Sequence, residues 1–315
     1  MNLMVLAALL TADSPDANII PAGAKLEKMR SDGAFTEGPA YVPGGCVYFS
    51  DIGITPDPHE GNRIVKYDPA TGKATVYRSP SGRANGLDFD PDGRLIAAEG
   101  ADAGGTRRVT RTEKDGAVVV LADRWMCKKL NRPNNATADT KGRIYFSDPR
   151  YFGDEPRDID SECVYRIDPD AKLTQLITDM EKLNGVILSP EMKTLYVAEA
   201  NPKGKQQLLA YPLHDDGGVG AKKVLYDSGK DRGIDGMVVD ANGNIYAAAG
   251  EKDKAGVCIF SPEGKQLGFI PTPETPTNCV FGDKERKSLC VTAGKSLYRI
   301  KLNAEGFAVY WPKEE

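Results

Sequence analysis

The chain contains six versions of one stretch of sequence, and two of them, GPAYVPGGCVYFSD at 38–51 and NATADTKGRIYFSD at 135–148, align almost by eye. Each version is an apolar run, a turn rich in Gly, Pro, Asp or Asn, and a second apolar run. The versions start at Gly38, Gly86, Asn135, Gly185, Gly236 and Cys279, so successive starts lie 48, 49, 50, 51 and 43 residues apart. Repeats of this length built from paired strand-like runs are typical of the four-stranded blades of a β-propeller.

The second run of each version alternates polar and apolar residues and is rich in β-branched and aromatic side chains, as in RIYFS at 143–147. That period of two indicates a strand. We therefore predict an all-β fold, a six-bladed β-propeller with four-stranded antiparallel blades around a central metal site. A propeller must close on itself, and we expect Lys25–Ala34 to add the outer strand to the last blade, whose other strands lie within 278–312.

The two ends of the chain set the expected domain limits. Residues 1–20 are interpreted as a leader or a signal segment, because a short apolar core at 1–10 precedes small residues but lacks a positive n-region. Residues 21–315 are expected to form a single propeller domain, since closed all-β folds often exceed the usual domain length. Localisation stays open: periplasmic or secreted if residues 1–17 are a signal segment, and cytoplasmic otherwise.

Composition argues against two classes of partner, nucleic acid and membrane. The formal net charge is −4 and no run of Lys and Arg occurs, so we expect no nucleic acid as partner. No apolar segment reaches the roughly 18 residues of a membrane span, so we expect no membrane association either. We expect a monomer. The six cysteines form no CxxC pair, and four of them fall in strand-like runs as small buried thiols.

One polar residue stands immediately before each version of the repeat. These residues are Glu37, Asn85, Asn134, Asn184, Asp235 and Asn278, each eight positions before the turn residue of its repeat. Blades arranged in a ring would bring all six side chains to its axis. Such residues could instead cap strand ends, which would explain the asparagines well. It explains the two carboxylates poorly, because like charges converging on one axis repel and require a cation.

The predicted ligands also select the cation. Hard oxygen donors without His or Cys favour calcium, magnesium or manganese over zinc. Calcium is the first choice, because neutral amide oxygens suit its large coordination shell, and Mg2+, Mn2+ or Zn2+ are the alternatives.

Arg132 lies two residues before the axial Asn134, and Pro133 stiffens the approach between them. An arginine at the mouth of a blade could simply be solvated. Beside a ring of oxygens it also suits a site that must hold a polar substrate, and we prefer this second interpretation.

Two other features of the sequence suggest functional sites. The stretch DFDPDG at 88–93 with Glu99 matches an EF-hand calcium loop, but an EF-hand needs flanking helices and this stretch lies between two predicted strands. We interpret it as a hairpin turn. The two histidines, His59 and His214, lie in polar segments of loop character, where a zinc site or a Ser–His–Asp triad would need one at its centre.

Four pieces in order resemble the senescence-marker-protein/gluconolactonase/luciferin-regenerating-enzyme family, which are six-bladed propellers. The pieces are FTEGP at 35–39, RPNN at 132–135, NG at 184–185 and DG at 235–236, within a match from about 30 to 300. The resemblance implies that Glu37, Asn184 and Asp235 bind a divalent metal, that Arg132 and Asn134 contact substrate, and that Asp235 is the general base. The chain departs from the family at Asn135, where Asp is usual.

The resemblance implies a metal-dependent hydrolase that opens a sugar lactone. In this mechanism the metal polarises the carbonyl and Asp235 activates water. A propeller that binds a ligand or a protein without catalysis is the alternative from another class. An arylesterase or organophosphate hydrolase using the same metal is the alternative among enzymes.

Overall fold

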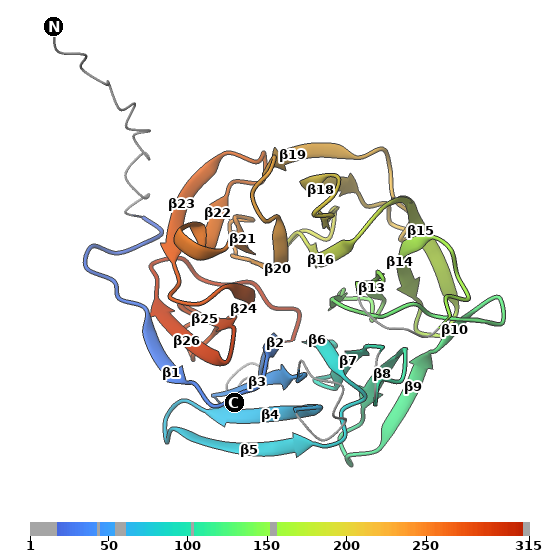
Figure 1. Ribbon diagram of the computed structural model, residues 1–315, viewed down its shortest axis with the longest axis horizontal. Helices are drawn as coiled ribbons and strands as arrows, with labels where there is room; N and C mark the ends of the chain where they lie inside the picture. Colours follow the sequence, from blue (N-terminus) through green and yellow to red (C-terminus); the bar gives the residue numbers. More distant parts are fainter. Residues whose placement is uncertain (1–17, 43–44, 54–60, 102–103, 152–155, 311–315) are drawn as a thin grey trace, which may run out of the picture.

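The computed structural model describes residues 18–42, 45–53, 61–101, 104–151 and 156–310. In these residues six four-stranded antiparallel sheets form a ring, with the strand at the start of each repeat innermost (Figure 1). The predicted six-bladed, all-β propeller is confirmed. A two-stranded hairpin, β10 (Arg124–Trp125) with β11 (Lys128–Lys129), leads into the third blade.

The blades follow the chain in order. The first three consist of β2 (Thr36–Val42), β3 (Cys46–Asp51), β4 (Arg63–Asp68) and β5 (Lys73–Arg78); β6 (Ala84–Phe89), β7 (Leu95–Glu99), β8 (Arg108–Thr112) and β9 (Val118–Ala122); and β12 (Ala136–Ala138), β13 (Ile144–Asp148), β14 (Glu162–Ile167) and β15 (Leu173–Met180). The next two consist of β16 (Leu183–Leu188), β17 (Thr194–Ala200), β18 (Gln206–Pro212) and β19 (Lys223–Asp227); and β20 (Ile234–Val239), β21 (Ile245–Ala249), β22 (Gly256–Phe260) and β23 (Gln266–Pro271). A short 3-10 helix, Lys252–Lys254, precedes β22.

The last blade closes the ring with a strand from the other end of the chain. It consists of β24 (Pro276–Gly282), β25 (Ser288–Ala293) and β26 (Ser296–Lys301), and β1 (Glu27–Arg30) pairs with β26 as the outer strand. Glu27 lies opposite Arg299, and the two side chains form an ion pair of 2.8 Å. The predicted closing segment Lys25–Ala34 is thus confirmed, and ring closure makes the terminal strands depend on each other.

The segment before β1 also packs on the last blade. Ile19 is buried with residues of the fifth and sixth blades, and its carbonyl accepts a hydrogen bond from the backbone N–H of Asn303. The predicted leader falls almost wholly in residues 1–17, outside the described residues. No helical element in the described ranges has the length and apolar character needed to cross a membrane.

Burial follows the position of a strand in its blade. The second strands β13 and β21 are buried along their whole length, whereas the outer strand β5 has no buried residue. Inner strands are covered on both faces by neighbouring blades, which is why they are continuous apolar runs. The core therefore forms a wheel of clusters between adjacent blades, and it holds the inner strand ends at fixed positions around the axis.

The innermost strands bend at the axial residues. Pairing of the first and second strands shifts register next to the axial residue in five blades, for example between Glu37 and Ala40 and between Ile234 and Met237. Such bulges kink a strand and re-aim its side chains. In the third blade the regular ladder begins only at Ala136, directly after the axial Asn134 and its neighbour Asn135.

Glycines after four of the axial residues allow the inner strands to approach one another. A Cβ at Gly38 would lie 2.0 Å from the carbonyl oxygen of Asn85, and a Cβ at Gly185 would lie 2.4 Å from that of Asp235. These distances are far inside van der Waals contact, so the glycine after the axial residue is a packing requirement.

Candidate functional site at the propeller axis

All six predicted axial residues are buried, with exposures from 3% for Glu37 to 8% for Asp235. Each lies at the inner end of its blade. The structure brings the side chain of Asn278 to hydrogen-bonding distance of Asn135, 143 positions away in sequence. Sequence periodicity therefore located the axial position in every blade.

Two of these residues, Glu37 and Asp235, form what we call the carboxylate pair. Burial raises the pKa of Glu37 well above its ordinary value, and the nearby Asp235 raises it further. The backbone N–H of Gly38 donates to the Glu37 Oε2 at 3.1 Å and opposes this shift. Burial also raises the pKa of Asp235, opposed by Arg232 and Asn184. Two buried carboxylates that raise each other's energy in this way favour a cation between them.

Arg232 is a site residue that the sequence analysis missed. Its guanidinium donates to the Asp235 Oδ2 at 2.5 Å and also to the backbone carbonyls of Gly250 and Pro276. These three bonds fix the guanidinium and the rotamer of Asp235 together. The signal was its place three residues before an axial carboxylate, comparable with Arg132 two residues before Asn134.

The remaining polar groups at the axis are neutral amides. We call Asn134, Asn135, Asn184 and Asn278 the amide cluster, because hydrogen bonds of 2.7–3.1 Å connect the other three to Asn135. Asn184 lies close enough to the Asp235 carboxylate to oppose the rise of its pKa, so the amide cluster and the carboxylate pair are neighbours.

Arg132 is 7% exposed, so its side chain is not simply solvated. Its backbone N–H donates to the Asp148 Oδ1 at 2.7 Å, and the N–H of Asn131 donates to the other oxygen at 2.8 Å. The charge of Arg132 lowers the pKa of Glu37, which places its guanidinium within electrostatic reach of the carboxylate pair.

Asp148 is the second residue that the sequence analysis missed. It holds the approach to Asn134, and Asp51 does the same in the first blade by accepting the N–H groups of Ala34 and Phe35. Both end the sequence FSD at the second strand of their repeat, which is the signal that could have identified them. Asp51 has an ion pair with Arg63, whereas burial raises the pKa of Asp148 to about 7.

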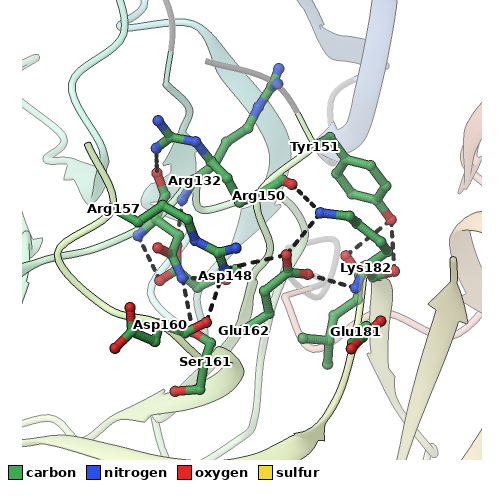
Figure 2. Close-up of polar contacts among 12 residues, drawn as sticks. Arg132, Asp148, Arg150, Tyr151, Arg157, Asp160, Ser161, Glu162, Glu181 and Lys182 are labelled. Atoms are coloured by element: carbon green, nitrogen blue, oxygen red, sulfur yellow. Dashed lines mark hydrogen bonds and ion pairs between the residues drawn. The ribbon is translucent and has the colours of Figure 1, made fainter. Parts of the chain in front are cut away.

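The segment 149–151, which follows β13 in the third blade, contacts the chain just before the fourth blade. The hydroxyl of Tyr151 donates to the backbone carbonyl of Lys182 at 2.7 Å, two residues before Asn184. The Lys182 ammonium in turn contacts the carbonyl of Arg150 and the carboxylate of Glu162 (Figure 2). This network fixes the strand that carries Asn184.

Beside this network is a cavity of about 730 Å³ between the third and fourth blades. Lys182 and Glu162 form part of its wall, but none of the six axial side chains lines it. The cavity is therefore a neighbour of the axial site and not the axial site itself.

The EF-hand-like stretch is a strand–turn–strand unit, as expected. Its carboxylates have separate protein partners: Asp88 accepts the N–H of Ala138 in the next blade, and Glu99 pairs with Arg78 and Arg108. His214 lies in an exposed turn, and His59 lies outside the described residues.

The axial donors fit a hard divalent cation. Two carboxylates and several amide oxygens converge there, and the Oδ1 of Asn85 is buried with no hydrogen-bond partner among the described residues. An acceptor oxygen without a donor is suited to a cation. In the described ranges no three His, Cys, Asp or Glu side chains are placed to hold a metal ion together, so the two axial carboxylates would need further oxygen ligands, which the axial amides can supply.

The chain belongs to the SMP-30/gluconolactonase/LRE-like family, whose model matches residues 35–295. It is 28% identical to a gluconolactonase of Zymomonas mobilis, over 91% of this chain and 84% of that protein. It is also 28% identical to the pentonolactonase XacC of Haloferax volcanii, over 81% of this chain and 80% of the relative. Among solved structures, a gluconolactonase from Xanthomonas campestris superposes with a TM-score of 0.80 at 28% identity, covering 92% of this chain and 93% of that one.

Proposed function

We propose that the protein is a divalent-metal-dependent lactonase that opens a sugar lactone at the propeller axis. The observation that carries the proposal is the carboxylate pair, two buried acidic side chains converging beside amide oxygens and Arg132. Family membership and relatives named as gluconolactonase and pentonolactonase support lactones as the substrate class. Calcium is the preferred cation, because the donors are hard oxygens and several of them are neutral.

Glu37, Asn184 and Asp235 are the proposed ligands. A cation bound there would supply Lewis-acid polarisation of the lactone carbonyl and stabilise developing negative charge. Asp235 removes a proton from the attacking water and returns it to the ring oxygen as the ester opens. Arg232 holds the Oδ2 of that carboxylate, and so it orients the base.

Arg132 and Asn134 are proposed to bind the substrate. Asp148 fixes the backbone that presents Arg132, and Asn135 fixes the side-chain oxygen of Asn134. Binding of the carbonyl or the sugar hydroxyls by these groups places the carbon close to the attacking water, which lowers the entropic part of the barrier. The proposed steps require no covalent intermediate.

The test is hydrolysis of D-glucono-1,5-lactone followed by pH-stat, with EDTA and then with calcium restored. Turnover that EDTA abolishes and calcium restores is the expected result. Turnover unaffected by EDTA would refute the metal, and absence of turnover with bound calcium would refute this lactone as substrate. Phenyl acetate and paraoxon in the same assay test the arylesterase and organophosphate hydrolase alternatives.

A further inference from the structure

Asn135 occupies a position that is glycine in four of the six blades. In those blades a side chain would collide with the neighbouring inner strand, as the 2.6 Å between a Cβ on Gly86 and the Asn134 carbonyl oxygen shows. In the third blade the side chain is present, is 6% exposed and lies among the axial amides. The hydrogen bonds of this buried polar side chain therefore indicate its role.

The direction of the hydrogen bonds in the amide cluster is set by one backbone group. The N–H of Cys279 can only donate, and it donates to the Asn278 Oδ1 at 2.8 Å. Asn278 must then present its Nδ2 to its other partner, which is the Asn135 Oδ1 at 2.8 Å. An amide has one acceptor end and one donor end, so each orientation determines the next.

Asn135 carries this orientation to two site residues. With its Oδ1 occupied by Asn278, its Nδ2 donates to the Asn134 Oδ1 at 2.7 Å and to the Asn184 Oδ1 at 3.1 Å. With its Oδ1 accepting from Asn135, Asn184 has its Nδ2 available for the neighbouring Asp235 carboxylate, which can only accept. The chain of hydrogen bonds runs from the backbone of the sixth blade to Asn184, which lies beside the candidate base in the fifth.

We propose that Asn135 is a positioning residue that relays the orientation of the Cys279 N–H to Asn134 and Asn184, and so decides which end of each amide faces the substrate and Asp235. This inference rests on the proposed function for its consequence in catalysis, but the relay itself is a property of the protein without metal or substrate. Outer groups that orient site residues typically change affinity or activity by about 10–100-fold when altered.

The test uses Asn278→Asp, which is isosteric and does not touch Asn184 in the hydrogen bonds above. The carboxylate still accepts the Cys279 N–H but cannot donate, so Asn135 must reverse and present its Oδ1 to Asn134 and Asn184. In EDTA, we expect the side-chain amide NMR signals of Asn184 to shift and one Asn135 amide proton to exchange about tenfold faster or more. Asn135→Asp removes both donors directly and should shift the Asn184 signals in the same way.

Asn85→Asp is the matched control, because it adds the same charge at the axial position of another blade outside the amide cluster. It is expected to leave the Asn184 amide orientation unchanged. Equal shifts in Asn85→Asp and Asn278→Asp, or no shift in Asn278→Asp, would refute the relay. Should the Asn278 variant not fold, rapid exchange of both Asn135 amide protons in the unaltered protein would refute it equally.

Kinetics then separates the relay from the proposed function. If the protein is a lactonase, Asn278→Asp should lower kcat/KM or calcium affinity by about 10–100-fold. Shifted Asn184 signals with no lactone turnover in the unaltered protein would leave the relay standing and reject the proposed function. Shifted signals with unchanged kcat/KM and calcium affinity would reject the positioning role.

Discussion

The carboxylate pair and the amide cluster take the same axial positions in different blades, yet they are held in opposite ways. Asn134, Asn184 and Asn278 satisfy one another through Asn135, because every amide both donates and accepts. Carboxylates only accept, so Glu37 accepts the backbone N–H of Gly38 and Asp235 accepts from the guanidinium of Arg232. The amides therefore satisfy one another, whereas each carboxylate depends on a donor outside the amide cluster, Gly38 for Glu37 and Arg232 for Asp235.

The largest effect is expected on turnover, when one axial carboxylate is removed. Asp235→Ala should lower kcat/KM for D-glucono-1,5-lactone by about 10²–10⁴-fold, because it removes the proposed base and a metal ligand. Circular dichroism should show the β-sheet content unchanged. The matched control is Asp231→Ala, four residues earlier, which removes an exposed ion pair with Lys254 and should leave kcat/KM unchanged. Full activity in the Asp235 variant would end the proposed mechanism.

A second variant replaces one carboxylate of the pair with an amide. Glu37→Gln should weaken calcium binding by at least about 10–100-fold in titration calorimetry, since a ligand contributes no less than an outer group. In EDTA the same variant should be more stable than the unaltered protein at pH 8, because the raised pKa of Glu37 means that its ionised form is disfavoured in the fold.

The raised pKa of Glu37 sets the sign of the pH dependence of stability. Below the ordinary carboxyl pKa the folded and unfolded states are both protonated and Glu37 imposes no penalty. As pH rises through the raised folded value the penalty appears in full, so the stability of the unaltered protein falls while that of Glu37→Gln does not. Denaturant unfolding in EDTA at pH 5 and pH 8 measures this, and a stability difference between the two proteins that does not change with pH would contradict it.

The smallest expected effect concerns the two aspartates that end the second strands of the first and third blades, Asp51 and Asp148. The pKa of Asp148 is raised from 3.8 to about 7 by burial, so the folded state binds more protons than the unfolded state between these values. Stability should therefore fall as pH rises from about 4 to about 7, by at most a few kcal/mol. Asp148→Asn should remove this part of the slope.

Asp51→Asn is the counterpart in the first blade. Asp51 forms an ion pair of 2.7 Å with Arg63, so its replacement leaves Arg63 without this carboxylate and should lower the free energy of unfolding at neutral pH by about 1–3 kcal/mol. An unchanged free energy of unfolding at neutral pH in Asp51→Asn, measured by denaturant unfolding, would contradict a stabilising role for this ion pair.

How far the site was predictable depends on which residues repeat. Glu37 and Asp235 were identified because the same position is polar in all six blades, and periodicity puts equivalent positions at one place in the ring. Arg232 and Asp148 were missed because their roles depend on partners outside the repeat alignment: the carbonyls of Gly250 and Pro276, and the N–H groups of Asn131 and Arg132. Asn135 was visible as a departure from the family, but its role was not.

The sequence by itself determined the number of blades, the closing strand and the axial position of each repeat, because alternation and repeat length are local properties that any neighbour in the ring must accommodate. Only the tertiary structure decided which axial groups meet and in what orientation. Whether Asn135 collides or fits depends on the path of the adjacent inner strand, and which end of Asn184 faces Asp235 depends on a backbone N–H in another blade. Hydrogen bonds between residues more than 140 positions apart leave no local pattern, since their direction is fixed by the assembled ring.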